Sequence, residues 1–476
     1  MIELLNNLWP HIAAALTFLI AIFTSGHAIL HKSDTRSTVG WVGLIWLVPV
    51  LGSLLYILLG INRIRRRARN IRPDHAFSYS QEVPKKPDNI DIPPQFHGFS
   101  HLVHTIIQKP LLKGNTLQPL INGDEAFPAM ISEIDRSEHS INMMTFIFDS
   151  GRSGKKFVEA LGRAVQRGVK VRVIIDDVGA RYSFPAVTRM LRRSGIKVAR
   201  FLPTMIPWRT HYVNLRNHRK ILVIDGKKGF TGGINIREGL MLRESPKHPF
   251  HDLHFRVDGP VVGHLQEVFL SDWAFCTGEV LSGAEWYPIS DDNGTAISRG
   301  IPDGPDEDFE KLQWIVHGAL TAAQSSVRIV TPYFIPDSAL IKTINLTALR
   351  GIKVDIILPA TNNLPLVKWA SMDLLQQILE HGCKVWLTPP PFDHSKIMIV
   401  DDVWTLLGSA NWDTRSFRLN FEFNVECYDR TLADRLNQII NAKIDVAHNV
   451  TLADINNRTL PVKLRDGIAR LFSPYL

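Results

Sequence analysis

The sequence carries one pattern twice, as Asn217-His218-Arg219-Lys220-Ile221-Leu222-Val223-Ile224-Asp225 and as His394-Ser395-Lys396-Ile397-Met398-Ile399-Val400-Asp401. In both copies a lysine follows the histidine by two residues, and an aspartate comes after four further residues. Ten residues beyond each aspartate stands an asparagine, Asn235 or Asn411, which ends a Gly-Gly-x-Asn or Gly-Ser-x-Asn sequence. A single copy would be a weak signal. Two copies with the same offsets indicate a duplicated fold with two equivalent half-sites.

The spacing within each copy predicts which side chains share a face. The four apolar residues after each lysine are typical of a strand that is buried on both faces. Because side chains two residues apart point to the same side of a strand, His218 lies with Lys220, and His394 with Lys396. The aspartates fall at the turn after the strand, and each asparagine, on the next strand, can come alongside. If the halves face each other, we expect six groups to converge on one phosphate.

Strand and helix signals recur around both copies of the pattern. Gly168-Val169-Lys170-Val171 is matched by Gly351-Ile352-Lys353-Val354, and Gly195-Ile196-Lys197-Val198 is matched by Gly382-Cys383-Lys384-Val385. The alternation of strands with helices predicts an α/β fold whose sheets are covered on both faces. We predict two like α/β domains, at 117–290 and 296–476, that are related by pseudo-twofold symmetry. A proline-rich linker at 73–116, with a short apolar helix near 101–108, precedes them.

The composition excludes several classes of protein. The chain has 476 residues, of which 45% are hydrophobic and 21% charged, so it is neither intrinsically disordered nor fibrous. Its three cysteines, Cys276, Cys383 and Cys427, lie far apart. This number and spacing argue against a disulfide framework or a cysteine-based zinc site, and they fit a reducing compartment.

The amino terminus predicts a two-helix transmembrane hairpin within residues 1–72. No charged side chain occurs between Glu3 and Lys32, or between Arg36 and Arg63. The stretches 12–30 and 40–61 are each long enough to span a bilayer core, which needs about 20 helical residues. A cleaved signal peptide fits poorly, because residues 1–7 carry no positive charge. Two buried core helices stay open as the alternative.

A cluster of arginines directly after the second stretch predicts the orientation. The cluster consists of Arg63, Arg65, Arg66, Arg67, Arg69 and Arg72. By the positive-inside rule, everything after residue 62 lies in the cytoplasm. Arginines at this position also favour contact with anionic membrane lipids.

Two histidines that face each other across a phosphodiester can divide the chemistry. A neutral imidazole attacks phosphorus and forms a phosphohistidine, while a protonated one gives its proton to the leaving alkoxide. Lysines and amides stabilise the charge on the non-bridging oxygens, so no metal or other cofactor is required. The candidate catalytic residues are His218, Lys220, Asp225, His394, Lys396 and Asp401. The candidate phosphate-binding residues are Asn235 and Asn411.

The doubled motif resembles the phospholipase D superfamily, and the chain as a whole resembles its bacterial cardiolipin synthases. Besides the two motifs, the resemblance rests on Leu51-Gly52-Ser53-Leu54-Leu55-Tyr56, Thr331-Pro332-Tyr333-Phe334-Ile335-Pro336-Asp337, Gly408-Ser409-Ala410-Asn411-Trp412-Asp413-Thr414-Arg415-Ser416 and Asn420-Phe421-Glu422. It implies a multi-pass protein of the bacterial inner membrane, with two phospholipase D-like domains on the cytoplasmic side. It also implies transfer of a phosphatidyl group from one phosphatidylglycerol to another, which gives cardiolipin and glycerol. By the same resemblance His218 is the nucleophile, His394 the acid and base, and Glu422 a supporting acidic residue.

At two places this sequence departs from the family pattern, which limits the residue roles that the resemblance implies. Without a gap, the position in the first half that corresponds to Glu422 is Pro246, so an acidic partner is available there only if a loop insertion moves the role to Asp252. In addition, residues 250–254 carry phenylalanine and histidine where the resemblance leads us to expect tryptophan and arginine. The role of this loop therefore stays open.

Other functions remain possible from the sequence. A membrane phospholipase D that hydrolyses lipids, or one that uses phosphatidylethanolamine as donor, would need the same residues. A nuclease is less favoured, and no nucleic acid is expected, because much of the net charge of +8 lies in the juxtamembrane arginines. Intact histidines and lysines argue against a non-catalytic membrane scaffold. Oligomeric state, acyl-chain preference and the choice of nucleophile are not determined by the sequence.

Overall fold

The structure is a computed structural model that describes residues 2–32, 35–60, 91–182, 186–203, 215–283, 286–288, 293–305, 308 and 310–473. The chain divides into two compact units, an N-terminal unit, Met1–Ile71, and a large unit, Arg72–Leu476. The whole of the predicted arginine cluster, together with residues 73–90 of the predicted linker, lies outside the described residues.

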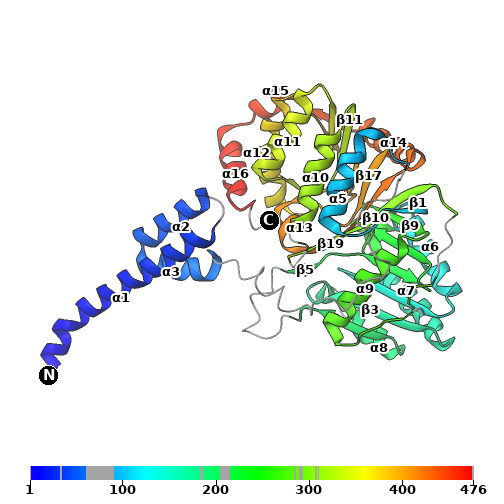
Figure 1. The fold of residues 1–476 in the computed structure, drawn as a ribbon, viewed down its shortest axis with the longest axis horizontal. Helices are drawn as coiled ribbons and strands as arrows, with labels where there is room; N and C mark the ends of the chain where they lie inside the picture. Colours follow the sequence, from blue (N-terminus) through cyan, green and yellow to red (C-terminus); the bar gives the residue numbers. More distant parts are fainter. Residues whose placement is uncertain are drawn as a thin grey trace. The chain divides into compact units, whose positions relative to one another are not determined.

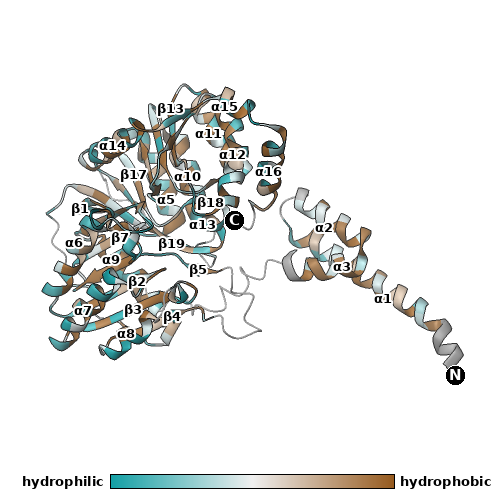
Figure 2. Ribbon diagram, turned by 180° about the vertical axis from the view of Figure 1, so that it is seen from behind, coloured by the Kyte–Doolittle hydropathy of each residue, from teal (hydrophilic) through white to brown (hydrophobic). Residues whose placement is uncertain are grey.

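The N-terminal unit is helical. It contains α1 (Ile2–His31), α2 (Thr35–Leu47), α3 (Pro49–Leu55) and a π-helical turn, η1 (Tyr56–Gly60) (Figure 1). Within α1, Leu8–His31 is long and apolar enough to cross a membrane. In Figure 2, brown marks the hydrophobic residues along this helix. This helix covers the first of the two predicted membrane spans.

The second predicted span, residues 40–61, is not one continuous helix. Pro49 has no N–H group to continue α2, and Val48 leaves the helical conformation with φ −137° and ψ 77°, so the chain starts again as α3. Side chains still join α3 and η1 to α1, because Thr24 Oγ1 lies 3.1 Å from Ser53 Oγ and His27 Nδ1 lies 2.8 Å from Tyr56 OH. Within the described ranges, α1 alone has the length and composition of a membrane span.

One sixteen-stranded sheet forms the centre of the large unit (Figure 1). The first half of the unit contributes β1 (Leu112–Ile121), β2 (Ser140–Thr145), β3 (Lys170–Asp176), β4 (Lys197–Phe201), β5 (Arg216–Asn217), β6 (Ile221–Ile224), β7 (Lys228–Gly232) and β9 (Leu253–Asp258). The second half contributes β10 (Ala296–Asp303), β11 (Ser326–Val330), β13 (Lys353–Pro359), β14 (Lys384–Thr388), β16 (Ile397–Val400), β17 (Trp404–Gly408), β19 (Asn420–Tyr428) and β20 (His448–Val450).

The strand order repeats on the two sides of the sheet centre. Across the sheet it reads β4-β3-β2-β6-β7-β9-β1-β10-β19-β17-β16-β11-β13-β14-β20, and β5 pairs with β19. On each side three neighbouring strands run parallel, as β2, β3 and β4 or as β11, β13 and β14, and β20 adds an antiparallel edge strand beside β14. The innermost strand of each trio then pairs antiparallel with the strand that follows a histidine motif, β6 or β16. In the middle, β1 pairs antiparallel with β10.

Helices cover the sheet and bury its strands from both sides. They are α5 (His97–Ile107), α6 (Asn122–Arg136), α7 (Arg152–Gln166), α8 (Val187–Arg193), α9 (Val262–Thr277), α10 (Lys311–Ala322), α11 (Ser338–Leu349), α12 (Pro365–Leu379), α13 (Thr414–Arg418), α14 (Arg430–Ile444), α15 (Leu452–Asn456) and α16 (Leu460–Leu471). Successive residues of β3 enter different cores, because Val173 and Ile175 pack with Leu161 of α7 whereas Ile174 packs with Phe269 of α9. This alternation confirms the mixed α/β fold predicted from the apolar strands.

Part of the predicted linker is folded into the large unit. Phe96 and Phe99 are buried, with ring centroids 5.7 Å from Tyr428 and 5.2 Å from Trp404. The predicted short helix corresponds to α5, and β1 begins at Leu112, ahead of the predicted boundary at 117. The segment before the first half therefore helps to form the core of the second half.

Candidate active site

Each histidine motif is held by backbone of the opposite half. His218 follows β5, which pairs with β19 of the second half, and its N–H donates to Phe421 O at 2.9 Å. His394 follows β15 (Phe392–Asp393), which pairs with β8 (Phe250–His251) of the first half, and its N–H donates to His251 O at 2.7 Å. Each histidine is thus fixed where the two halves meet.

Each imidazole also pairs with a buried carboxylate of the opposite half. His218 Nδ1 lies 3.0 Å from Glu422 Oε1 and 3.0 Å from Oε2, and His394 Nδ1 lies 2.8 Å from Asp252 Oδ2. A ring nitrogen that faces a carboxylate carries the proton, which leaves Nε2 as the atom available for chemistry. Glu422 also accepts hydrogen bonds from Ser409 Oγ and from Asn420 Nδ2.

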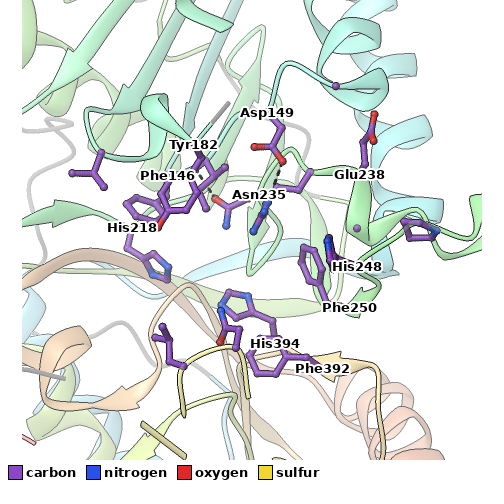
Figure 3. A pocket seen from close by; sticks show the side chains of 18 of the residues that line it. Phe146, Asp149, Tyr182, His218, Asn235, Glu238, His248, Phe250, Phe392 and His394 are labelled. Carbon is purple, nitrogen blue, oxygen red and sulfur yellow. Dashed lines mark hydrogen bonds and ion pairs between the residues drawn. The ribbon is translucent and has the colours of Figure 1, made fainter. Parts of the chain in front are cut away.

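The two imidazoles enter one cleft. Their ring centroids lie 6.5 Å apart at an interplanar angle of 84°, and Figure 3 shows the rings approaching the same space from opposite sides. The cleft has a volume of about 1520 Å³, and residues of both halves line it. At this separation the two rings can contact one phosphate group from opposite sides.

Aromatic rings flank both histidines. The Phe146 ring centroid lies 5.4 Å from that of His218, and the Phe392 and Tyr333 centroids lie 5.9 Å and 6.1 Å from that of His394. The Tyr333 hydroxyl donates to Asn363 Oδ1 at 2.8 Å. These apolar walls restrict how the imidazoles can turn, and they remove water from around the reacting group.

The predicted lysines and asparagines lie at or beside the cleft. Lys220 and Lys396 are only 2% and 4% exposed, and each ammonium donates to the carbonyl oxygen of the histidine in its own motif. Asn235 and Asn411 both line the cleft. The Asn235 amide oxygen accepts the N–H of Ile147 at 3.0 Å, so its NH₂ group stays available for an anion.

The predicted catalytic aspartates lie away from the cleft. Asp225 accepts three backbone N–H groups of residues 138–140 at 2.7–2.9 Å, and Asp401 accepts those of residues 324–326 at 2.7–3.0 Å. Each stands in the left-handed conformation directly after a four-residue strand, five residues and therefore about 16 Å from the lysine that precedes that strand. They fasten a turn to the start of a neighbouring strand and are not among the cleft-lining residues.

Burial and charge shift the pKa values of the groups at the cleft. Burial lowers the pKa of His218, while Glu422 acts in the opposite direction. Burial, with Lys396 and Lys220 nearby, lowers the pKa of His394 well below its ordinary value. Burial also lowers the pKa of Lys220 to about 7 and of Lys396 to about 8, because the charged ammonium loses its hydration.

The two carboxylates respond differently to burial. Burial raises the pKa of Asp252 to about 6. Burial acts in the same direction on Glu422, but His218, Lys220 and the hydrogen bond from Ser409 outweigh it and lower the pKa of that carboxyl. Glu422 is therefore the more firmly ionised of the two partners.

The structure identifies Asp252 as the acidic partner of His394, a role that the sequence spacing left open. Ungapped spacing points to Pro246, which lines the cleft but carries no carboxylate, whereas Asp252 contacts His394. The only sequence signal was an acidic residue a few positions away, within a loop of different length. The aromatic neighbours of the histidines and the exchange of partners between halves were not predicted.

Comparison with known proteins identifies the family of the chain. The family described as "Cardiolipin synthase, PLD-like domain" matches residues 130–273 and 316–444, and a phospholipase D-nuclease N-terminal family matches residues 15–60. A cardiolipin synthase of Geobacillus thermodenitrificans is 30% identical over 94% of this chain and 90% of its own length. A cardiolipin synthase of Staphylococcus aureus is 30% identical over the whole of both chains.

A solved structure shares the fold. The phosphatidylserine synthase of Haemophilus influenzae superposes with a TM-score of 0.61 at 15% identity, over 80% of this chain and all of that one. At this identity the likeness concerns the fold alone. The full-length identity to the named relatives and the doubled family match carry the assignment: the chain belongs to the cardiolipin synthases of the phospholipase D superfamily.

Proposed function

We propose that this enzyme transfers a phosphatidyl group from one phosphatidylglycerol to a hydroxyl of a second, giving cardiolipin and glycerol. The observation that carries the proposal is the pair of imidazoles, each oriented by a carboxylate and with ring centroids 6.5 Å apart in one cleft. Relatives named cardiolipin synthase match the chain over its whole length, which supports this choice among phosphodiester chemistries.

In the first step we assign His218 as the nucleophile. Its Nε2 attacks the phosphorus of the donor lipid, the bond from phosphorus to the glycerol headgroup oxygen breaks, and His394 gives its proton to that oxygen. The firmly ionised Glu422 supports this assignment, because it holds the Nδ1 proton of His218 and stabilises the positive charge that the ring acquires.

In the second step the acceptor lipid takes the place of glycerol. His394, now neutral, removes the proton from a hydroxyl of the second phosphatidylglycerol. That oxygen attacks the phosphohistidine, the bond from phosphorus to nitrogen breaks, and cardiolipin leaves. Lys220, Lys396, Asn235 and Asn411 are assigned to the non-bridging phosphate oxygens in both steps.

Substrate binding helps to set the protonation states that this mechanism needs. Burial and two nearby ammonium groups, those of Lys396 and Lys220, lower the pKa of His394. A phosphodiester brings a negative charge between these cations, which favours the protonated imidazole. The acid therefore becomes charged when the group that it must protonate is bound.

We further propose a pseudo-twofold relation between the halves and a two-span anchor in the inner membrane. The repeated strand order and the exchanged histidine partners support the first proposal. For the second, α3 packs against α1 although α2 and α3 are separate helices, so the pair can cross the bilayer together with α1. The arginine-rich sequence that follows supports a cytoplasmic position for the large unit.

The test is a product assay with purified full-length protein in vesicles that contain phosphatidylglycerol labelled in its headgroup and in its acyl chains. Labelled cardiolipin together with free glycerol is expected. Phosphatidic acid as the main product would instead identify a hydrolytic phospholipase D. A second vesicle set with labelled phosphatidylethanolamine tests that lipid as the donor, and the His218→Ala variant serves as the inactive control.

A further inference from the structure

Helix α16 presents its apolar side to solvent. Four residues spaced for one helical face, Leu460, Leu464, Ile468 and Leu471, are 57% to 72% exposed, and Phe472 directly after the helix is 50% exposed. We call these five residues the leucine stripe. An ordinary surface helix buries such a stripe against the core and turns its polar side outward.

The opposite side of α16 faces the large unit and buries Asp466 and Ala469. Asp466 is 1% exposed and accepts hydrogen bonds from Arg458 Nη1 at 2.7 Å and from Arg465 Nη2 at 2.7 Å. Two contacts then fix the helix on α12: the Arg465 guanidinium lies 4.6 Å from the Trp369 ring centroid, and Arg470 lies 3.0 Å from Asp373. These contacts hold α16 in an orientation that leaves the stripe outside.

The charges around the stripe are mostly positive. Arg458, Lys463 and Arg465 lie on or just before α16, against the single buried carboxylate of Asp466. Lys463 Nζ donates to the carbonyl oxygen of Asn456, so this contact leaves its charge uncompensated. An apolar stripe flanked by basic side chains is the pattern of a helix that lies in the interface of an anionic bilayer.

The same surface adjoins the cleft. α12, on which α16 packs, contributes Val367 to the cleft, and Leu364 directly before α12 lines the cleft and is 48% exposed. A membrane that contacted α16 would thus contact a helix pair that also forms a wall of the lipid-binding cleft. A second copy of the chain is a weaker candidate, since five side chains are far fewer than the roughly 20–30 residues per partner in a standard protein interface.

We propose that α16 is an interfacial helix that docks the large unit on the surface of an anionic bilayer, with the leucine stripe inserted among the lipids. This contact is separate from the amino-terminal anchor. Its effect on activity rests on the proposed lipid substrate, whereas the docking itself does not.

The docking is tested with an environment-sensitive fluorophore at position 464 in full-length protein reconstituted into vesicles. The variant Leu464→Cys is made with Cys276→Ser, because Cys276 is the partly exposed cysteine and Cys383 and Cys427 are buried. A blue-shifted emission that nitroxide-labelled lipids quench is expected, and it should be stronger with phosphatidylglycerol than with phosphatidylcholine alone. The control label, at the exposed Glu159 of α7, should show neither response.

Two outcomes of the fluorescence experiment would overturn the proposal. One is an emission at position 464 that matches the Glu159 control. The other is a blue shift that lipid nitroxides do not quench and that disappears when the protein is diluted in lipid, because a second copy would then cover the stripe.

A kinetic experiment separates docking from chemistry. Leu464→Ser combined with Ile468→Ser should raise the KM for phosphatidylglycerol in vesicles by about tenfold, since two inserted side chains lose their apolar contact. The same variant should keep its kcat/KM for short-chain, monomeric phosphatidylglycerol. The matched control is Leu346→Ser with Leu349→Ser, which alters exposed leucines of α11 and should leave both values unchanged. An unchanged vesicle KM in the α16 variant would contradict the docking and leave the proposed transfer reaction intact.

Discussion

His218 Nδ1 lies 3.0 Å from both carboxylate oxygens of Glu422, a residue 204 positions further along the chain and in the other half of the large unit. The reciprocal contact joins His394 to Asp252 across 142 positions. In both contacts, the histidine and its carboxylate partner come from different halves. The duplicated halves are thus dependent on each other, and the active cleft exists only where they meet.

Removing the negative charge at Glu422 should impair catalysis more than binding. In Glu422→Gln the amide can no longer stabilise a positively charged His218 ring, so we expect kcat to fall by about 10²–10⁴-fold with little change in KM. Steady-state transfer assays measure both constants. The double variant with His218→Ala should be no slower than His218→Ala alone, and additive losses would contradict the pairing.

The two histidines should be separable with an activated substrate. A phosphodiester with a nitrophenol leaving group does not need a proton from an acid, so His394→Ala should still form the phosphohistidine at position 218 and release nitrophenol in one burst. Mass spectrometry of the acid-sensitive adduct locates the phosphate. A phosphate on residue 394 in His218→Ala, with none on residue 218 in His394→Ala, would reverse the assigned roles.

The pH dependence of kcat/KM should be bell-shaped. Asp252 must be ionised to orient His394, and since burial raises its pKa to about 6, the rate should rise as the pH increases through about 6. Lys220 and Lys396 must be protonated, and since burial lowers their pKa values to about 7 and about 8, the rate should fall as the pH passes through that range. In the residual activity of Asp252→Asn the acidic limb near pH 6 should be lost, and on the acidic side only the fall caused by protonation of His218 at lower pH should remain. A profile that is flat between pH 5 and pH 9 would contradict this use of the buried groups.

The motif aspartate Asp225 should matter for stability rather than for chemistry. Asp225→Ala removes three hydrogen bonds to backbone N–H groups and places alanine at a φ of +51°, so the free energy of unfolding should fall by about 2–4 kcal/mol. Asp225→Asn, which tolerates this φ and keeps some of the acceptors, should lose less. Denaturant titration measures the loss, and kcat/KM of the folded fraction should stay near that of the unaltered protein. A loss of kcat/KM comparable with that of His218→Ala would restore the aspartate to the catalytic machinery.

Transfer should persist in excess chelator. The carboxylates beside the histidines are engaged as their hydrogen-bond partners, and the mechanism assigns the phosphate charge to lysine and asparagine side chains. Activity measured after dialysis against EDTA should equal that of the untreated enzyme. A loss that one divalent metal restores would contradict the mechanism.

The sequence predicted the groups that form the site, and it also predicted a catalytic role for two aspartates that lie away from the cleft. The spacing of His218 and Lys220, and the apolar strand after them, are local features that a strand period of two residues determines. The same period carries Asp225 to the far end of that strand, where backbone N–H groups of residues 138–140 surround it. The prediction of a catalytic role relied on motif membership rather than on this distance.

The second membrane span shows a similar limit. The uncharged stretch 40–61 indicates an apolar segment, but hydropathy does not register the missing N–H of Pro49, at which α2 and α3 separate. The folding of residues 91–111 into the large unit was also hidden, because the partners of Phe96 and Phe99, Tyr428 and Trp404, lie more than 300 positions away.

The sequence by itself determined the set of side chains at and beside the cleft: two histidines, two lysines and two asparagines in repeated register, on strands of an α/β fold. The tertiary structure alone decided which carboxylate serves which histidine, because the pairing crosses between the halves through β5–β19 and β8–β15. The physical reason is the distance along the chain over which each effect acts. Strand periodicity is set by neighbours along the chain, whereas the position of Glu422 beside His218 depends on how two separately encoded halves pack against each other.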